Sequence, residues 1–221
     1  MATPQSPSPA TNRSCLRPPI EQLAIAAAYL NNAVSAHIAN QFELASALID
    51  EANKSPIREA IREWTESLWG KASLYVQYRP VPGAPPVIPR AQRNHLRMPS
   101  STEKFLLHER DGYRCRFCGV PVIRREVRNR LRELYPDVVP WGTTNRDQHA
   151  ALQALWAQYD HILPHGRGGT NGLDNMLITC APCNFARMDY TLDEVGLADP
   201  RIRPPIQSSW DGLERLLRSS Q

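Results

Sequence analysis

Apolar residues recur every three or four positions along the first third of the chain. One series contains Ile20, Leu23, Ala27, Leu30, Val34 and Ile38, and a later one contains Ile57, Ile61, Trp64 and Leu68. This spacing puts each series on one helix face and predicts about three amphipathic helices over residues 20–70. Ser55 and Pro56 are suited to begin the third helix, and Gly70 to end it. His37 falls on or near the apolar face and is interpreted as a core or rim residue.

Prolines interrupt the pattern over residues 80–100, where Pro80, Pro82, Pro85, Pro86, Pro89 and Pro99 occur. They exclude a long helix and predict an extended linker over 79–100, which separates a helical N-terminal domain (20–78) from a second domain (101–200). Residues 1–19 are rich in Ser, Thr, Pro and Ala and lack acidic residues. We interpret them as a disordered tail and not as a transit peptide, because no amphipathic pattern is present. Residues 201–221 are expected to form a tail with a short helix.

The spacing of apolar residues changes in the second domain, where both helices and strands are predicted. Ser100 and Glu103 have capping-box spacing, and Gly112 suits the end of the helix that they begin. Residues 158–163 and 175–179 are predicted as strands and 182–188 as a short helix, with a glycine-rich loop over 164–172 between the strands. Within an insertion over 120–158, two more helical patterns, one with Val122, Val127, Leu131 and Leu134 and one with His149, Leu152, Leu155 and Trp156, predict a helical hairpin. The predicted fold class is α+β.

Four of the five cysteines form two CxxC pairs, Cys115 with Cys118 and Cys180 with Cys183. Each pair can present two sulfurs to one ion, so the four can close a tetrahedral structural zinc site. A disulfide framework is the alternative, but pairs at this spacing in an intracellular chain favour metal. Cys15 has no predicted partner.

The charges are unevenly placed. The net charge is +4, but residues 79–132 hold 13 Lys or Arg and 4 Asp or Glu, a local net of +9. A solvated helix surface is the ordinary reading of such a run. Because all but one of these basic residues are arginine, whose planar guanidinium suits phosphate, we favour a phosphate-binding surface.

The motifs between residues 101 and 190 together resemble an HNH endonuclease. The resemblance rests on Arg110 to Gly119 (RDGYRCRFCG), Asp160 to Gly169 (DHILPHGRGG), Leu173-Asp174-Asn175 and Cys180 to Asn184 (CAPCN). It implies a ββα-metal (His-Me finger) module with a four-cysteine zinc site and metal-dependent cleavage of DNA. It also implies that Asn175 pins the loop and so orients His161 through a hydrogen bond. The long insertion departs from a compact HNH unit.

Residue chemistry suggests how such a site would work. Asp160 and Asn184 offer oxygen ligands that suit a catalytic Mg²⁺ or Mn²⁺, and His161, on the opposite side of the strand from Asp160, is free to act as general base. Asn184 stands where many relatives have a histidine, giving an H-N-N variant and making Zn²⁺ or Ni²⁺ less suited to the catalytic position. His165 and His149 are interpreted as surface or packing residues, with His165 a secondary site candidate.

The predicted nucleic-acid contacts are arginines near these motifs: Arg167, Arg114, Arg116, Arg124, Arg125 and Arg128. A structural loop role for Arg167 is the alternative to a phosphate clamp. DNA is the expected partner, RNA stays open, and a protein partner or homodimer through residues 20–70 or 120–158 is also open. A zinc-stabilised binding module without catalysis is the competing function. No apolar run of membrane-spanning length and no charged-then-apolar leader are present, so we expect a soluble cytoplasmic protein without a membrane partner.

Overall fold

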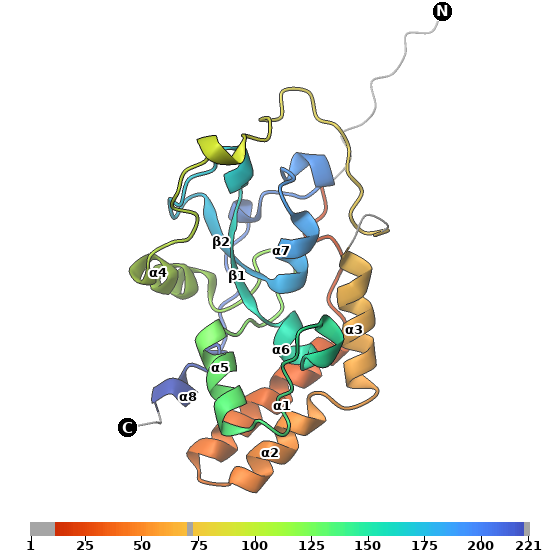
Figure 1. Ribbon diagram of the computed structural model, residues 1–221, viewed down its shortest axis with the longest axis vertical. Helices are drawn as coiled ribbons and strands as arrows, with labels where there is room; N and C mark the ends of the chain where they lie inside the picture. The colour runs from red at the N-terminus through yellow and green to blue at the C-terminus, as the bar shows by residue number, and fades with distance from the viewer. Residues whose placement is uncertain (1–11, 70–72, 219–221) are drawn as a thin grey trace, which may run out of the picture.

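The computed structural model describes residues 12–69 and 73–218, and within them the chain is a mixed α+β fold with one two-stranded sheet (Figure 1). The helices and strands are α1 (Glu21–Ile38), α2 (Phe42–Glu51), α3 (Ile57–Leu68), α4 (Ser101–Asp111), α5 (Arg125–Leu134), α6 (Ala150–Ala154), β1 (Ala157–His161), β2 (Met176–Cys180), α7 (Ala181–Arg187) and α8 (Arg215–Arg218), with short 3-10 helices at 90–92, 145–147, 165–167, 193–195 and 200–202. The coarse α+β prediction is confirmed.

The three predicted N-terminal helices are present as α1, α2 and α3. α1 begins directly after Ile20, and α3 begins after Pro56 and ends at Leu68, while Gly70 lies outside the described residues. The apolar faces are buried, with Leu30 and Trp64 each 0% exposed. His37 lies at the rim, where its Nδ1 atom is 2.7 Å from the hydroxyl of Tyr135.

α4 begins with the predicted capping box. Ser100 Oγ accepts a hydrogen bond from the Glu103 backbone, and the Glu103 carboxylate accepts one from the Ser100 backbone. These bonds satisfy two of the free N–H groups at the helix start. The helix ends at Asp111 and is capped by Gly112, whose φ of 67° is a left-handed conformation that favours glycine.

β1, β2 and α7 follow one another in the predicted β, β, α order. The strands pair antiparallel with Asp160 opposite Leu177, and α7 packs against both (Figure 1). β1 starts and ends earlier than predicted, because the chain turns into the glycine-containing loop after His161. All five residues of β2 are buried, since α4 and α7 both pack against this strand.

The insertion forms α5 and α6, and the second helix is shorter than its apolar pattern suggests. α6 stops at Ala154, and Trp156 instead forms a parallel bridge with Ile123. This backbone pairing connects the start of the insertion to the start of β1, so Trp156 leads directly into the strand.

The proline-rich segment packs along the second domain and is held there by hydrogen bonds. The Ile88 backbone N–H donates to Gly166 O at 2.7 Å, and Asn94 O is 2.9 Å from the His165 ring. The buried core also continues from α1 and α3 into α6 and α7 across the expected boundary. The helical region therefore packs directly on the module that carries the candidate site.

The expectation of a disordered tail over residues 1–19 does not hold for its second part. Arg13 N donates to Gly196 O, Ala198 N donates to Arg13 O, and Leu16 is only 3% exposed. Residues 12–19 are held in place by this backbone bridge to a distant segment and by one buried apolar side chain. Residues 1–11 lie outside the described part of the chain.

Candidate metal centre and adjoining polar site

The four paired cysteines come together at one point. The Sγ atoms of Cys115, Cys118, Cys180 and Cys183 lie within 4.8 Å of one another, and those of Cys118 and Cys180 are 3.7 Å apart. A tetrahedral zinc ion with Zn–S bonds of about 2.3 Å would hold its sulfurs roughly 3.8 Å apart. All four are free thiols in this structure, so the donor set fits a metal ion such as zinc.

Local structure explains how the sulfurs converge. The first pair lies in a tight turn closed by Cys115 N to Val120 O at 2.9 Å and Gly119 N to Cys115 O at 2.8 Å. The second pair spans the end of β2 and the first turn of α7. Although burial raises the pKa of the Cys115 thiol, hydrogen bonds from the other three cysteines lower it overall, which favours a thiolate there.

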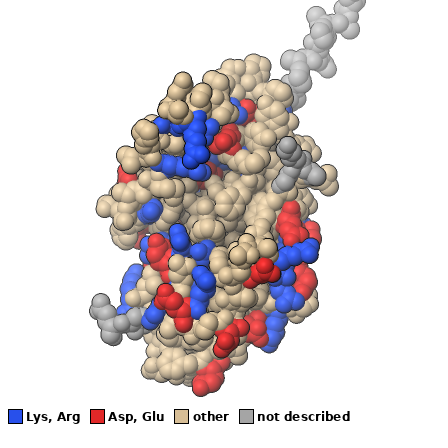
Figure 2. All heavy atoms as spheres, in the orientation of Figure 1, with Lys and Arg blue, Asp and Glu red and all other residues tan. Residues whose placement is uncertain are grey.

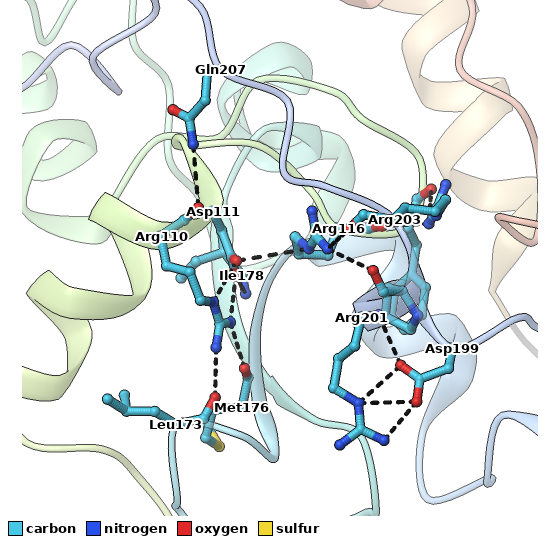
Figure 3. Close-up of polar contacts among 12 residues, drawn as sticks. Arg110, Asp111, Arg116, Leu173, Met176, Ile178, Asp199, Arg201, Arg203 and Gln207 are labelled. Carbon is cyan, nitrogen blue, oxygen red and sulfur yellow. Dashed lines mark hydrogen bonds and ion pairs between the residues drawn. The ribbon is translucent and has the colours of Figure 1, made fainter.

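A buried carboxylate, Asp111, holds this centre to its surroundings (Figure 3). It is 0% exposed, accepts a hydrogen bond from Ile178 N at 2.8 Å, and forms two bonds of 2.8 and 2.9 Å with Arg110. Arg116, inside the first cysteine pair, approaches the same carboxylate at 3.7 Å. Asp111 therefore joins the end of α4, the middle of β2 and the first cysteine pair.

The second buried carboxylate, Asp160, is paired with Arg187 of α7. Arg187 Nε donates to one carboxylate oxygen at 3.0 Å and its Nη2 to the other at 2.5 Å. The Asp160 side chain is 8% exposed and the Arg187 side chain 1%. Arg187 also donates to the backbone oxygens of His161 and Tyr190, which ties β1 to the end of α7.

His161 lies next to this pair, with its ring held by a residue from the glycine-containing loop. Its Nε2 atom is 2.9 Å from Asn171 Oδ1, and the Asn171 amide donates to Leu96 O at 2.9 Å and Met98 O at 3.3 Å. Because Asn171 Oδ1 can only accept, this contact places a proton on His161 Nε2. Burial lowers the pKa of His161, while the Asn171 hydrogen bond acts in the opposite direction.

Asn175 fastens the loop that carries Asn171. Its Oδ1 accepts from Leu163 N at 2.8 Å, and its Nδ2 donates to Leu163 O at 3.2 Å and Thr170 O at 2.8 Å. The side chain thus closes both ends of the loop. No hydrogen bond joins Asn175 to the His161 ring among the described residues; Asn171 makes that contact.

Asn184 lies one helical turn before Arg187 on α7 and is partly buried. Residues three apart share a helix face, and Arg187 shows that this face is turned toward Asp160. Asp160 and His161 lie at the end of β1, and Asn184 lies on α7, the helix that packs against this strand.

Four of the six predicted nucleic-acid-binding arginines already have protein partners. Arg124 forms bonds of 2.5 and 2.6 Å with Glu214, and Arg167 pairs with Glu194 at 2.8 Å. Arg114 donates to Ser208 and Gly119 O, and Arg116 to Pro200 O and Arg203 O. The contacts of Arg167 are those of a structural loop residue.

The other two predicted arginines lie on α5 and differ from each other. Arg125 is exposed, while Arg128 is 5% exposed and lies between the rings of Trp141 and Trp156, at 4.0 and 4.4 Å from their centroids. Figure 2 shows a group of basic side chains in the upper part of the visible face with acidic side chains beside it, and both charges interspersed over the lower half.

Two exposed arginines adjoin the polar site without protein partners. Arg90 and Arg97 belong to the proline-rich segment, and neither side chain has a hydrogen bond or ion pair within the described part of the chain. The same segment contacts His165 through Asn94 and Asn171 through Leu96 and Met98. Arg97 therefore lies between two residues whose backbone oxygens hold the partner of His161.

Sequence reasoning missed Asn171, Arg187 and the specific pair Arg90 and Arg97. The motif drew attention to Asn175, and nothing local distinguishes Asn171 from any other loop asparagine. Arg187 is one of 26 lysines and arginines and carries no spacing signal of its own. Arg90 and Arg97 belong to the basic block from Arg79 to Arg132, but only the path of the segment shows that it runs along the loop that carries Asn171.

Comparison with known proteins does not identify the chain: no family model, no curated protein and no solved structure matches it. Within residues 12–69 and 73–218, no helix is both long and apolar enough to cross a membrane.

Proposed function

We propose that the protein is a metal-dependent HNH-type endonuclease that hydrolyses phosphodiester bonds in DNA. The observation that supports the proposal is that Asn171 holds His161 next to Asp160 at the end of β1, a strand packed against the helix that carries Asn184 and Cys183 of the four-cysteine cluster. In this reading the cysteines hold a structural zinc ion and Asp160 with Asn184 hold a catalytic Mg²⁺ or Mn²⁺.

His161 would accept the proton of the attacking water. With Nε2 protonated toward Asn171, the Nδ1 atom carries the lone pair that a general base needs. Asn171 is a positioning residue, because it keeps the ring in this tautomer and orientation. The lowered pKa keeps His161 neutral, and thus able to accept a proton, at neutral pH.

Asp160 keeps the capacity to bind a cation while it is paired with Arg187. A carboxylate offers about four lone-pair positions, and Arg187 uses one on each oxygen. A bound divalent ion would neutralise charge on the phosphate and stabilise the leaving oxygen. Arg187 would hold the carboxylate in a fixed orientation throughout.

The same ion pair supports a second candidate function, a zinc-stabilised nucleic-acid-binding module without catalysis. If Asp160 serves only to anchor Arg187, the ββα unit is a scaffold and Arg90 and Arg97 do the binding. The two functions differ in one measurable respect, since only the enzyme breaks phosphodiester bonds.

The test is cleavage of supercoiled plasmid, single-stranded DNA and RNA by the purified protein with Mg²⁺, Mn²⁺ or EDTA. We expect metal-dependent cleavage of DNA that His161→Ala lowers by roughly 10² to 10⁴. The control is His37→Ala, which removes a rim histidine bonded to Tyr135, away from the site. Absence of cleavage with every ion, together with retained DNA binding, would select the binding module, and undiminished cleavage by His161→Ala would reject the assigned base.

A further inference from the structure

A cavity with aromatic walls lies beside α7 and is separate from the cysteine centre. It measures about 480 Å³ and is formed at the junction of the N-terminal helices, the insertion and α7. The residues around it are Trp69, Arg128, Trp141, Asn145, Gln148, Gln153, Trp156 and Phe185. Four aromatic rings, three amides and one guanidinium thus surround a space of the size that small-molecule sites occupy.

The aromatic walls hold one another in place. Phe185, which directly follows Asn184, meets the edges of Trp69 and Trp156 at centroid distances of 6.2 and 6.4 Å. Phe185 is nonetheless 46% exposed. The cavity therefore offers a flat apolar surface that is open to solvent on one side.

Arg128 is a buried cation without a buried anion. Its guanidinium lies between Trp141 and Trp156, its only side-chain hydrogen bond in the described residues is one of 3.5 Å to Asn129, and Nε and Nη1 have no partner. Stacking on indole rings offsets part of the cost of burying this charge. The unused donors still lack the acceptor that buried groups normally have.

Two other polar groups on the cavity wall are also unpartnered. The Trp69 indole N–H is buried without an acceptor, and the Gln153 side chain, in a residue 7% exposed, makes no hydrogen bond within the described residues. Basic groups outnumber acidic ones around Arg128: Arg132 lies 5.8 Å from the Trp141 ring, and Arg125 and Arg132 act on Arg128 as like charges, while Glu126 alone acts as an opposite charge. A ligand that satisfies this wall is planar, carries hydrogen-bonding edges and bears negative charge.

We propose that this cavity binds one unpaired nucleotide of a DNA strand, with its base against Phe185 and Trp69 and its phosphate paired with Arg128. Bases stack on aromatic side chains in sites for single-stranded nucleic acid, and arginine pairs with phosphate. Phe185 is next to Asn184 on α7, and Trp156 lies at the start of the strand whose far end carries Asp160 and His161. A DNA strand bound along this unit could place one nucleotide in the cavity and a phosphate a few nucleotides further along at His161. The inference rests on the proposed function, since it names the form of the substrate.

The test is binding of DNA to the full-length, zinc-loaded protein in EDTA-free buffer without Mg²⁺, measured by quenching of tryptophan fluorescence. The probes are a 12-nucleotide single strand, a blunt duplex of the same sequence, and the free mononucleotides dAMP and TMP. We expect the single strand to bind at least tenfold more tightly than the duplex. Arg128→Gln and Phe185→Ala should each weaken single-strand binding about tenfold or more, the size that loss of one stacked base or one phosphate interaction produces.

Arg130→Gln is the matched control, since it removes the same charge from α5 at a residue that does not line the cavity. It should change binding less than twofold. Arg128 packs between two rings, so Arg128→Gln can unfold the protein. Phe185→Ala only truncates an exposed ring, and it keeps the test valid in that case. If the mononucleotides compete with the single strand, the site binds a single nucleotide. If they have no effect, the site binds a nucleotide only when it is part of a strand.

Wild-type affinity in Phe185→Ala and in a folded Arg128→Gln overturns the inference, as does a preference for the blunt duplex. These outcomes are separable from the proposed function by plasmid cleavage. If both variants cut plasmid and bind the single strand like the wild type, the nucleotide site is rejected and the nuclease proposal stands. If the wild type never cuts but both variants lose single-strand binding, the nuclease proposal is rejected and the nucleotide site stands.

Discussion

Arg187 donates two hydrogen bonds to the carboxylate of Asp160, one to each oxygen, at 3.0 and 2.5 Å. Both side chains are almost wholly buried. The pair joins the strand that carries His161 to the helix that carries Asn184. It is therefore the physical link between the two halves of the proposed active site.

Loss of Arg187 should destabilise the fold strongly. Arg187→Met leaves the Asp160 carboxylate buried without its cation, and breaking one side of a buried pair costs about 3–5 kcal/mol. Chemical denaturation measures the change. Arg201→Met is the matched control, because Arg201 pairs with Asp199 at 2.6 Å but its side chain is 53% exposed, and exposed pairs contribute at most about 1 kcal/mol. Equal effects of the two variants would contradict a structural role for the buried pair.

The four-cysteine centre should hold one metal ion per chain. Cys115→Ser removes a ligand, so we expect loss of bound zinc and of cooperative unfolding, because binding energy at such a site is folding energy. Elemental analysis and thermal unfolding measure both. Cys15→Ser is the control, since Cys15 is not among the four sulfurs that converge. Well-folded wild-type protein without metal would refute the assignment.

Replacing Asn171 and replacing Asn175 should have different effects on cleavage and on Tm. Asn171→Ala removes the partner of His161 Nε2 and should lower cleavage about 10- to 100-fold with a change in Tm of only a few degrees, because Asn171 is partly exposed. Asn175→Ala removes three bonds to the loop backbone and should lower both cleavage and Tm. If Asn171→Ala cleaves at the wild-type rate, the ring is not positioned by this contact.

Acid should destabilise the packing of the N-terminal helices on α6 through His149. Burial lowers the pKa of His149 from 6.5 to about 4. The ring is neutral in the fold, contacting Ile49 O at 3.2 Å and accepting from Leu152 N at 3.3 Å. Below pH 6.5 the unfolded chain binds a proton that the folded chain does not, so the free energy of unfolding falls as the pH falls toward 4.

The expected loss from His149 between about pH 7.5 and 5.5 is about 1 kcal/mol. Denaturation of the wild type and of His149→Gln at both pH values measures it. The variant should lose about 1 kcal/mol less than the wild type over this interval. Parallel losses in the two proteins would show that other groups, such as the buried His108, cause the acid effect.

Binding to DNA should depend on Arg90 and Arg97 more than on the partnered arginines. Replacing both by Gln should weaken binding and reduce the slope of log K against log salt, by about 0.9 on duplex DNA or about 0.7 on a single strand for each phosphate that is no longer neutralised. Arg124→Gln should leave that slope unchanged and instead lower stability, because it breaks the pair with Glu214. A double variant with the wild-type salt dependence would place the phosphate-binding groups elsewhere.

Features that depend on neighbours along the chain could be predicted from the sequence. The three N-terminal helices, the capping box of Ser100 and Glu103, and the β, β, α order are all present. The two CxxC pairs come together as expected, because each pair is already a local turn and only one long-range contact is needed to join them.

Contacts between residues far apart in sequence were decided by the tertiary structure. Asp160 and Arg187 are 27 positions apart, and nothing in the composition selects this arginine from the others. Arg128 was predicted to contact nucleic acid, and the sequence did not show that the insertion would fold so that its guanidinium lies against Trp141 and Trp156. Many partners are chemically equivalent for an arginine, so only the packing of the helices and strands determines which one it meets.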